Sequence, residues 1–164
     1  MPEGQDEKIG EKTVFPPSWL KKTEVEAFIL DALAYLGKDN WDLSVVFCGD
    51  AGIRALNRQF RSIDEPTDVL SFTLGEMDGE RFLPGDIVVS FEMVEENAGY
   101  FHVSVGEELR RLLLHGVLHL NGMDHRGHVA KTPENGEVEP MLQLQEDMLR
   151  ALVKNEKKGN KWEK

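Results

Sequence analysis

Three histidines in one short stretch carry the clearest chemical signal in this sequence. His115, His119 and His125 lie within the eleven residues HGVLHLNGMDH. His115 and His119 are four residues apart, so on a helix their imidazoles share a face about one turn apart and can hold one cation. Gly122 can adopt a positive φ where that helix ends, which would turn the chain so that His125 reaches the same ion. The spacing therefore predicts a three-histidine metal site.

The types of ligand favour zinc. Three neutral imidazoles suit borderline metals, and Cys48 is the only cysteine in the chain, which excludes a multi-cysteine site. We expect one Zn²⁺ per chain with one open coordination position, although Ni²⁺, Cu²⁺ or Fe²⁺ could use the same ligands. An open position indicates catalysis, because the ion lowers the pKa of a bound water and polarises a carbonyl or phosphoryl oxygen. Hydrolysis is the expected reaction class, and no residue is assigned to an organic cofactor.

The residue after the first histidine argues against peptide hydrolysis. The spacing H-x3-H-x2-G-x2-H also occurs in metzincin peptidases, where a Glu follows the first histidine and acts as general base. Here that position is Gly116, which has no proton acceptor. Asp124 could replace it, but a residue next to a ligand is better placed to orient an imidazole.

The overall charge disfavours general binding to nucleic acids. The 164 residues include 19 basic and 30 acidic side chains, for a net charge of -11, which repels phosphate backbones. We therefore expect no DNA binding. The segment Ala51 to Ile63 is an exception, because it contains three arginines and no acid.

The sequence shows no membrane segment. Apolar runs such as Leu112 to Leu114 are far shorter than the roughly 20 residues that span a bilayer. Residues 1–13 carry charges of both signs and no apolar stretch, unlike a secretory signal peptide. We expect a cytoplasmic protein that does not bind membranes.

The elements that position the histidines indicate an α/β (α+β) fold, with a small mixed sheet of about four strands flanked by helices. We expect a flexible extension at 1–13, one catalytic metal-binding domain at 14–153, and a flexible Lys-rich tail at 154–164. The periodicity predicts a helix from Thr23, capped with Glu26, to Gly37, a strand at 41–48, a helix at 50–60, strands at 69–74 and 86–91 around a turn-rich segment at 75–85, and helices at 92–100, 105–121 and 138–153. The metal site would lie on the helix at 105–121, which ends in a glycine turn as in zincins.

The histidine motif resembles the signature of the bacterial YbeY family, described as single-strand-specific metallo-endoribonucleases of ribosomal RNA maturation. The segment LNRQFRSIDEPTDVLSF at 56–72 resembles the second signature of that family. GDIVVS at 85–90 is similar to the strand that follows it, and 141–148 is similar to the closing helix. The resemblance extends from about residue 41 to residue 153, whereas the segment 126–140 is longer than in the family.

The resemblance implies that His115, His119 and His125 bind zinc and that Arg61 lies in the active-site groove. A guanidinium can hold a phosphate with two hydrogen bonds and stabilise the charge that develops on phosphorus, so we count Arg61 and His115 as catalytic. The alternative is that Arg61 is a solvated cation at a helix end.

The predicted function is a zinc-dependent, single-strand endoribonuclease that acts in 16S rRNA 3′-end maturation, ribosome biogenesis and ribosome quality control. Water or a 2′-OH could be the attacking group. Because the acidic surface weakens RNA capture, we expect the small ribosomal subunit or another basic docking protein to deliver the RNA. Two alternatives remain open. One is a metal-dependent hydrolase of peptides or esters, and the other is an assembly factor with structural zinc whose fourth ligand is His128 or Asp124.

Overall fold

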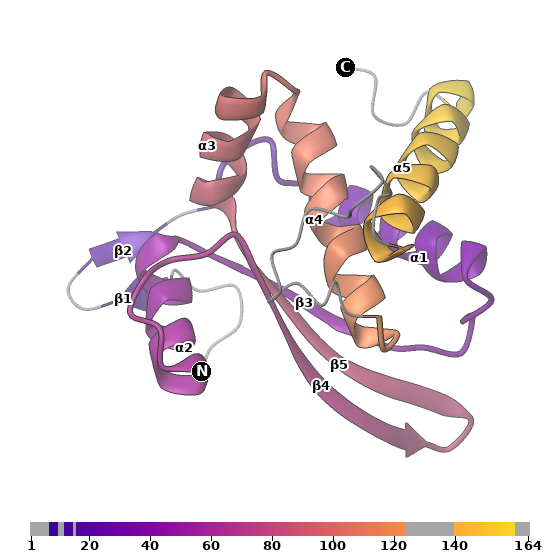
Figure 1. The fold of residues 1–164 in the computed structure, drawn as a ribbon, viewed down its shortest axis with the longest axis horizontal. Coiled ribbons are helices and arrows are strands. Elements are labelled where there is room, and N and C mark those ends of the chain that lie inside the picture. The colour runs from indigo at the N-terminus through magenta and orange to yellow at the C-terminus, as the bar shows by residue number, and fades with distance from the viewer. Residues whose placement is uncertain (1–6, 10–11, 15, 124–139, 160–164) are drawn as a thin grey trace.

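Helices cover both faces of one three-stranded sheet in the computed structural model (Figure 1), which confirms the predicted α/β class. The structure describes residues 7–9, 12–14, 16–123 and 140–159. Its elements are β1 (Glu7–Ile9), β2 (Lys12–Val14), α1 (Lys22–Tyr35), β3 (Ser44–Cys48), α2 (Asp50–Arg61), β4 (Val69–Asp78), β5 (Arg81–Ser90), α3 (Phe91–Phe101), α4 (Val105–Leu120) and α5 (Pro140–Gly159).

The main sheet is mixed, with the strand order β3-β5-β4. The central strand β5 pairs in parallel with β3 and antiparallel with β4. This sheet has three strands, where the sequence predicts about four. A separate antiparallel pair, β1 and β2, lies within the residues where the sequence predicts an extension. The β-branched residues Ile9, Thr13 and Val14 favour extended backbone there.

The predicted turn-rich segment at 75–85 is wrong, because β4 and β5 continue through it as one long hairpin. Of the glycines in this segment, Gly79 does lie in a turn, the two-residue turn of the hairpin, whereas Gly75 lies at a shift in the strand register. Gly85 has a φ of 145°, and a Cβ there would lie 2.0 Å from the carbonyl oxygen of Phe72. Glycine is therefore required at 85 because the paired strand lies against it.

The side chains of β5 alternate between two cores. Ile87 and Val89 pack with α1, α4 and α5 on one face of the sheet, while Val88 packs with Ile53 of α2 on the other. This alternation follows from the two-residue period of a strand. The larger core is on the side of α4, so the sheet supports the helix that carries the histidines.

Helix α4 lies unusually close to the sheet. A Cβ on Gly116 would be 2.9 Å from Cγ2 of Ile87, closer than real side chains approach, and Ile87 is fully buried. The helix begins at Val105 after the N-cap Ser104, whose hydroxyl accepts a hydrogen bond from the Glu107 amide at 3.0 Å. It ends at Leu120, and Gly122 has a φ of 84°. The predicted helix and its glycine turn are therefore both present.

Three helix ends differ from the predictions. Helix α1 begins at Lys22 after the N-cap Lys21, and its cap receives no side-chain hydrogen bond, so the predicted capping box is not formed. Helix α2 likewise has Gly49 rather than Asp50 as its N-cap. Helix α5 begins at Pro140, where proline suits the first helical turn, and is longer than predicted. Within the described ranges, none of the helices combines the length and the apolar character needed to span a bilayer.

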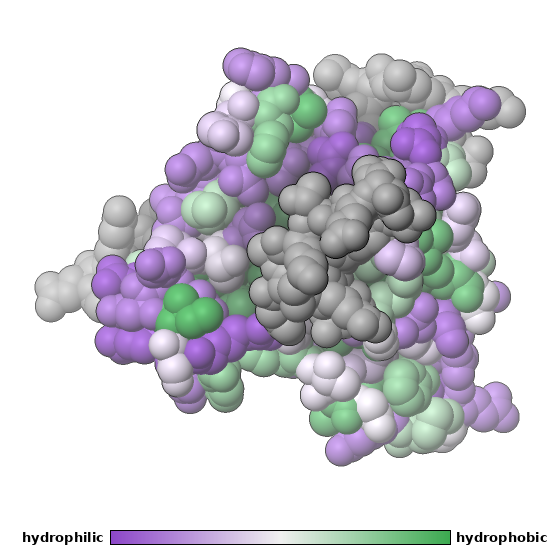
Figure 2. Space-filling view, viewed as in Figure 1, coloured by the Kyte–Doolittle hydropathy of each residue, from purple (hydrophilic) through white to green (hydrophobic). Residues whose placement is uncertain are grey.

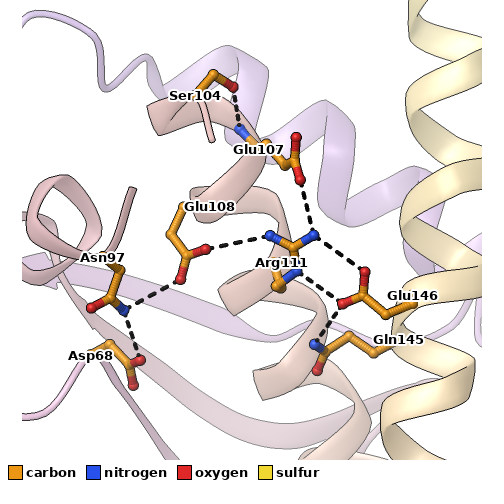
Figure 3. A network of polar contacts seen from close by, with 8 residues as sticks. All are labelled: Asp68, Asn97, Ser104, Glu107, Glu108, Arg111, Gln145 and Glu146. Atoms are coloured by element: carbon orange, nitrogen blue, oxygen red, sulfur yellow. Dashed lines mark hydrogen bonds and ion pairs between the residues drawn. The ribbon is translucent and has the colours of Figure 1, made fainter. Parts of the chain in front are cut away.

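Arg111 joins α4 to α5 through ion pairs (Figure 3). Its guanidinium donates to Glu146 of α5 at 2.9 and 3.2 Å and to Glu107 of α4 at 2.9 Å. It also lies 3.4 Å from Glu108, whose side chain is only 4% exposed. Burial raises the pKa of Glu108, while Asn97 and Arg111 oppose that rise. Arg111 is therefore the cation that compensates a buried carboxylate.

A methyl group at residue 116 tests the contact between α4 and the sheet. We expect Gly116→Ala to lower the free energy of unfolding by about 1–3 kcal/mol, because the buried Ile87 cannot easily move aside. Gly99→Ala is the matched control, since a Cβ there would meet nothing within 4 Å, and it should gain about 0.5–1 kcal/mol from helix propensity. Urea denaturation measures both, and equal stabilisation of the two variants would contradict the close contact.

The buried carboxylate makes the effect of removing Arg111 depend on pH. In Arg111→Met the folded-state pKa of Glu108 should lie further above its unfolded value. The contribution of Glu108 to the stability of the variant is then greatest below the unfolded-state pKa of Glu108. This contribution is lost as the pH rises through its folded-state pKa. We expect a loss of about 2 kcal/mol near neutral pH, below the ~3–5 kcal/mol of a fully buried pair, and a smaller loss at about pH 4.5.

Arg54→Met is the control for that experiment, because both side chains of the pair Arg54–Asp64 are about half exposed (54% and 53%). Its effect on stability should be small at both pH values. A loss in Arg111→Met that grows as the pH falls would contradict the role assigned to Glu108.

Candidate active site

The two histidines lie on a half-exposed stripe of an otherwise buried helix. Between Glu108 and Leu120, only Arg111, His115 and His119 are partly exposed, and they follow one another at intervals of four. The remaining residues of that range are buried, mostly by the core between α1, α5 and the sheet. The helical period therefore places one cation and two imidazoles in a single row.

His115 and His119 lie against each other as the sequence spacing predicts. Their ring centroids are 4.7 Å apart, and the ring planes are inclined at 73°. The third predicted ligand, His125, lies outside the described residues, as do Asp124 and His128. Within the described part of the chain, no group of three histidine, cysteine or acidic residues is placed to hold a metal. The structure thus places two of the three predicted ligands, and metal binding stays a prediction.

A buried glutamine from α5 contacts the first histidine. Gln145 is 5% exposed, and its Oε1 lies 2.8 Å from Nδ1 of His115. The amide nitrogen of Gln145 donates to Glu146 at 3.3 Å. Glu146 in turn accepts from Arg111, whose hydrogen bonds hold the pKa of that carboxyl below its ordinary value. Helix α5 therefore supplies hydrogen-bond partners to two of the three residues of the stripe.

Arg61 reaches the same part of α4 through one intermediate residue. Its guanidinium donates to the backbone carbonyl of Ser71 in β4 at 3.0 Å. The hydroxyl of Ser71 donates to the carbonyl of Gly116 at 3.4 Å, directly after His115 in the chain. Arg61 at the end of α2 and His115 in α4 come from opposite faces of the sheet, and β4 lies between them. The structure therefore links the two residues that the sequence analysis counted as catalytic.

Local contacts restrain the connection between α2 and β4, residues 62–68, at its beginning and in its middle. Ser62 adopts a left-handed conformation at the C-cap of α2. The side chain of the buried Asn57 donates to the carbonyl of Glu65 at 2.9 Å, and Arg54 pairs with Asp64 at 2.8 Å. The Arg54 hydrogen bond also keeps the pKa of Asp64 below its ordinary value. These contacts fix where the chain leaves Arg61.

One aromatic ring lies near the Arg61 guanidinium, and a second ring packs against the first. The guanidinium carbon lies 5.9 Å from the ring centroid of Phe72, and the Phe60 and Phe72 rings meet edge to face at 5.3 Å. Phe60 is 58% exposed. An exposed ring beside an exposed cation is a combination that single-stranded nucleic acids can use, because bases stack on the ring while the cation meets phosphate.

The sequence analysis did not identify Gln145 or Ser71. A signal for Gln145 was present, because it lies on the same helical stripe as Met141, Met148 and Leu152, all of which are buried. A polar residue within an apolar stripe needs a buried hydrogen-bond partner. Ser71 lies in the segment 56–72 that resembles a family signature, but its contact with the Gly116 carbonyl depends on the packing of β4 against α4.

Comparisons with known proteins show the family to which the chain belongs. The protein-family model described as Endoribonuclease YbeY matches residues 17–153. A protein of Treponema denticola named Endoribonuclease YbeY is 46% identical over 139 residues, which cover 82% of this chain and 85% of that protein. The Treponema pallidum (strain Nichols) protein of the same name is 44% identical over 156 residues, with 90% of each chain covered.

A solved structure supports the fold as well. The solution structure of the protein TM1509 from Thermotoga maritima is 30% identical in sequence and has a TM-score of 0.57, and the match covers 87% of each chain. The family match and the identities over most of the chain confirm the resemblance found in the sequence. This chain belongs to the YbeY family of endoribonucleases.

Proposed function

We propose that this protein is a zinc-dependent endoribonuclease that cleaves single-stranded RNA in the 3′-end maturation of 16S rRNA and in ribosome quality control. One observation carries the proposal. The phosphate-binding candidate Arg61 is joined through Ser71 to the helical turn that presents His115. Membership of the endoribonuclease family supports the reaction class.

The donors present suit the zinc ion that the proposal requires. His115 and His119 offer two imidazoles from one face of a rigid helix, and His125 is the third ligand expected from the sequence. When bound there, zinc supplies a Lewis acid and lowers the pKa of a water. His115 and His119 are both partly exposed, unlike their buried neighbours on α4.

Arg61 is proposed to bind the phosphate next to the cleaved bond. Its guanidinium is always charged, and its planar fork can donate to two phosphate oxygens, so it stabilises negative charge that develops during cleavage. The Ser71 carbonyl and the Phe72 ring hold the guanidinium on the sheet edge. Phe60, which is mostly exposed beside it, offers a surface on which an unpaired base can stack.

The same geometry disfavours a peptidase of the metzincin kind. That mechanism needs a glutamate directly after the first histidine, and here Gly116 occupies the position against Ile87. Even a Cβ at 116 would displace the buried Ile87 side chain. The position is thus committed to packing, and the acid-base group for RNA cleavage must come from elsewhere.

The proposed docking partner is a basic surface of the small ribosomal subunit, which would place the protein in the cytoplasm. The net charge of -11 opposes capture of free RNA. On the face drawn in Figure 2, hydrophobic residues lie in separate spots among hydrophilic ones. These features support recognition by charge, with the RNA delivered on the partner.

Replacing either histidine on α4 tests the metal site. We expect His115→Ala and His119→Ala to lose stoichiometric zinc and cleavage of a single-stranded RNA while they keep most of the fold, because α4 is buried by other residues. His102→Asn is the matched control, since His102 is exposed at the end of α3 and Asn tolerates its left-handed backbone. Metal analysis, circular dichroism and an RNA cleavage assay measure the three properties.

Full zinc content in both α4 variants would show that the metal site is assigned wrongly. Zinc that is lost from them without any change in cleavage would instead favour a structural metal. Because docking could be required for activity, the cleavage assay includes reactions with purified small ribosomal subunits.

Removing the Arg61 side chain separates substrate binding from metal binding. We expect Arg61→Ala to keep zinc but to lower RNA cleavage about 10²–10³-fold, the usual effect of losing one donor to a developing charge. Arg61→Lys should recover part of the rate, because it restores the charge without the planar fork. Arg58→Ala, one turn earlier on α2 and also exposed, should cleave nearly normally. Equal rates for the two alanine variants would make Arg61 an ordinary surface cation.

A further inference from the structure

We propose that Gln145 is a positioning residue that fixes the tautomer and the ring orientation of His115, so that Nε2 is the nitrogen directed to the metal. The proposal rests on the proposed function, in which His115 is a zinc ligand. It adds a residue of α5 to a site whose expected ligands all come from α4 and the segment that follows it.

The first step sets the orientation of the glutamine amide. Its two ends differ, because the nitrogen only donates hydrogen bonds and the oxygen only accepts them. The end 3.3 Å from Glu146 must be the nitrogen, because an ionised carboxylate only accepts. Oxygen Oε1 therefore faces His115.

In the second step, the pairing with Arg111 favours the ionised form of Glu146. Arg111 donates to both of its carboxylate oxygens, through Nε at 2.9 Å and Nη2 at 3.2 Å. Such a two-point pair is among the strongest charge-assisted hydrogen bonds, and it keeps the pKa of Glu146 below its ordinary value. The acceptor that orients Gln145 is thus itself held in place, as Figure 3 shows.

The third step assigns the proton on the imidazole. Because Oε1 of Gln145 can only accept, the hydrogen bond of 2.8 Å requires that Nδ1 of His115 carries the proton. In a neutral imidazole the lone pair is then on Nε2. The bond also restrains rotation of the ring about its Cβ–Cγ bond, which sets the direction of that lone pair.

Burial makes this restraint effective. Gln145 is 5% exposed and lies on the same stripe of α5 as Met141 and Met148, so its side chain has little room to adopt another conformation. Water competes poorly for a hydrogen bond in such an environment, and the bond is costly to leave unmade. Partners that orient a ligating histidine in this way typically strengthen metal binding by about 10–100-fold.

The experiment reads the tautomer directly in the full-length protein. Multiple-bond ¹⁵N–¹H correlation spectra at a pH where the imidazole is neutral distinguish a proton on Nδ1 from one on Nε2. We expect His115 to carry its proton on Nδ1 both with and without zinc. In Gln145→Leu the zinc-free protein should lose this preference, and the dissociation constant for zinc should rise about 10–100-fold in a competition with a chelator.

Gln143→Leu is the matched control. It makes the same substitution two residues away on the exposed side of α5, where Gln143 donates only to Asp147 at 3.0 Å. Its tautomer and zinc affinity should equal those of the unmodified protein. Glu146→Gln is a second test variant that keeps the size of the side chain. It removes the carboxylate that accepts from the Gln145 amide, so the preference of His115 for a proton on Nδ1 should weaken while the protein stays folded.

The outcomes separate this inference from the proposed function. A proton on Nε2 of His115 in the unmodified protein overturns the role of Gln145, whether or not Gln145→Leu folds. So does unchanged zinc affinity in a folded Gln145→Leu whose tautomer is also unchanged. If the unmodified protein binds no zinc, the proposed function fails instead, and the assignment of the metal-facing nitrogen fails with it.

Discussion

The close contact between Gly116 and Ile87 is the constraint on which the site depends. Because residue 116 has no side chain, α4 can lie directly on β5 and turn its other side toward α5. Because Gly116 lies between His115 and His119 in α4, this contact also fixes how far the two histidines lie from the sheet. Ser71 in β4 can donate to the Gly116 carbonyl only because the helix lies so low. The helix position thus determines both the histidine row and its link to Arg61.

The candidate site is assembled from elements on both faces of the sheet. Helix α4 supplies the imidazoles, and α5 supplies the hydrogen bonds that hold His115 and Arg111. Helix α2 contributes Arg61 from the opposite face, across the edge strand β4. A displacement of any one of these helices would change a distance between the two histidines and Arg61. The geometry of the candidate site and the packing of the core therefore depend on the same contacts.

Local patterns in the sequence predicted the parts of the fold that depend on neighbouring residues. The four-residue spacing of His115 and His119 predicted their shared helix face, and the membership of the family followed from contiguous motifs. The prediction of a turn-rich segment at 75–85 was wrong because of long-range packing: Gly75 indicated a turn but lies at a strand irregularity opposite the partner strand. Gln145 could have been suspected from its place in an apolar stripe, yet its partner is thirty residues earlier in the chain. The position of His125 lies outside the described residues.

The edge strand β4 has a consequence for how separate molecules behave. In a three-stranded sheet with the order β3-β5-β4, one side of β4 has no pairing strand among the described residues. Such an edge is a template for pairing with another copy, which leads to aggregation. Glu76 and Asp78 lie at the far end of this strand, and Glu80 lies in the turn beyond it. Charged side chains on an edge strand oppose such pairing, so the acidity that hinders RNA capture also protects the protein from aggregation.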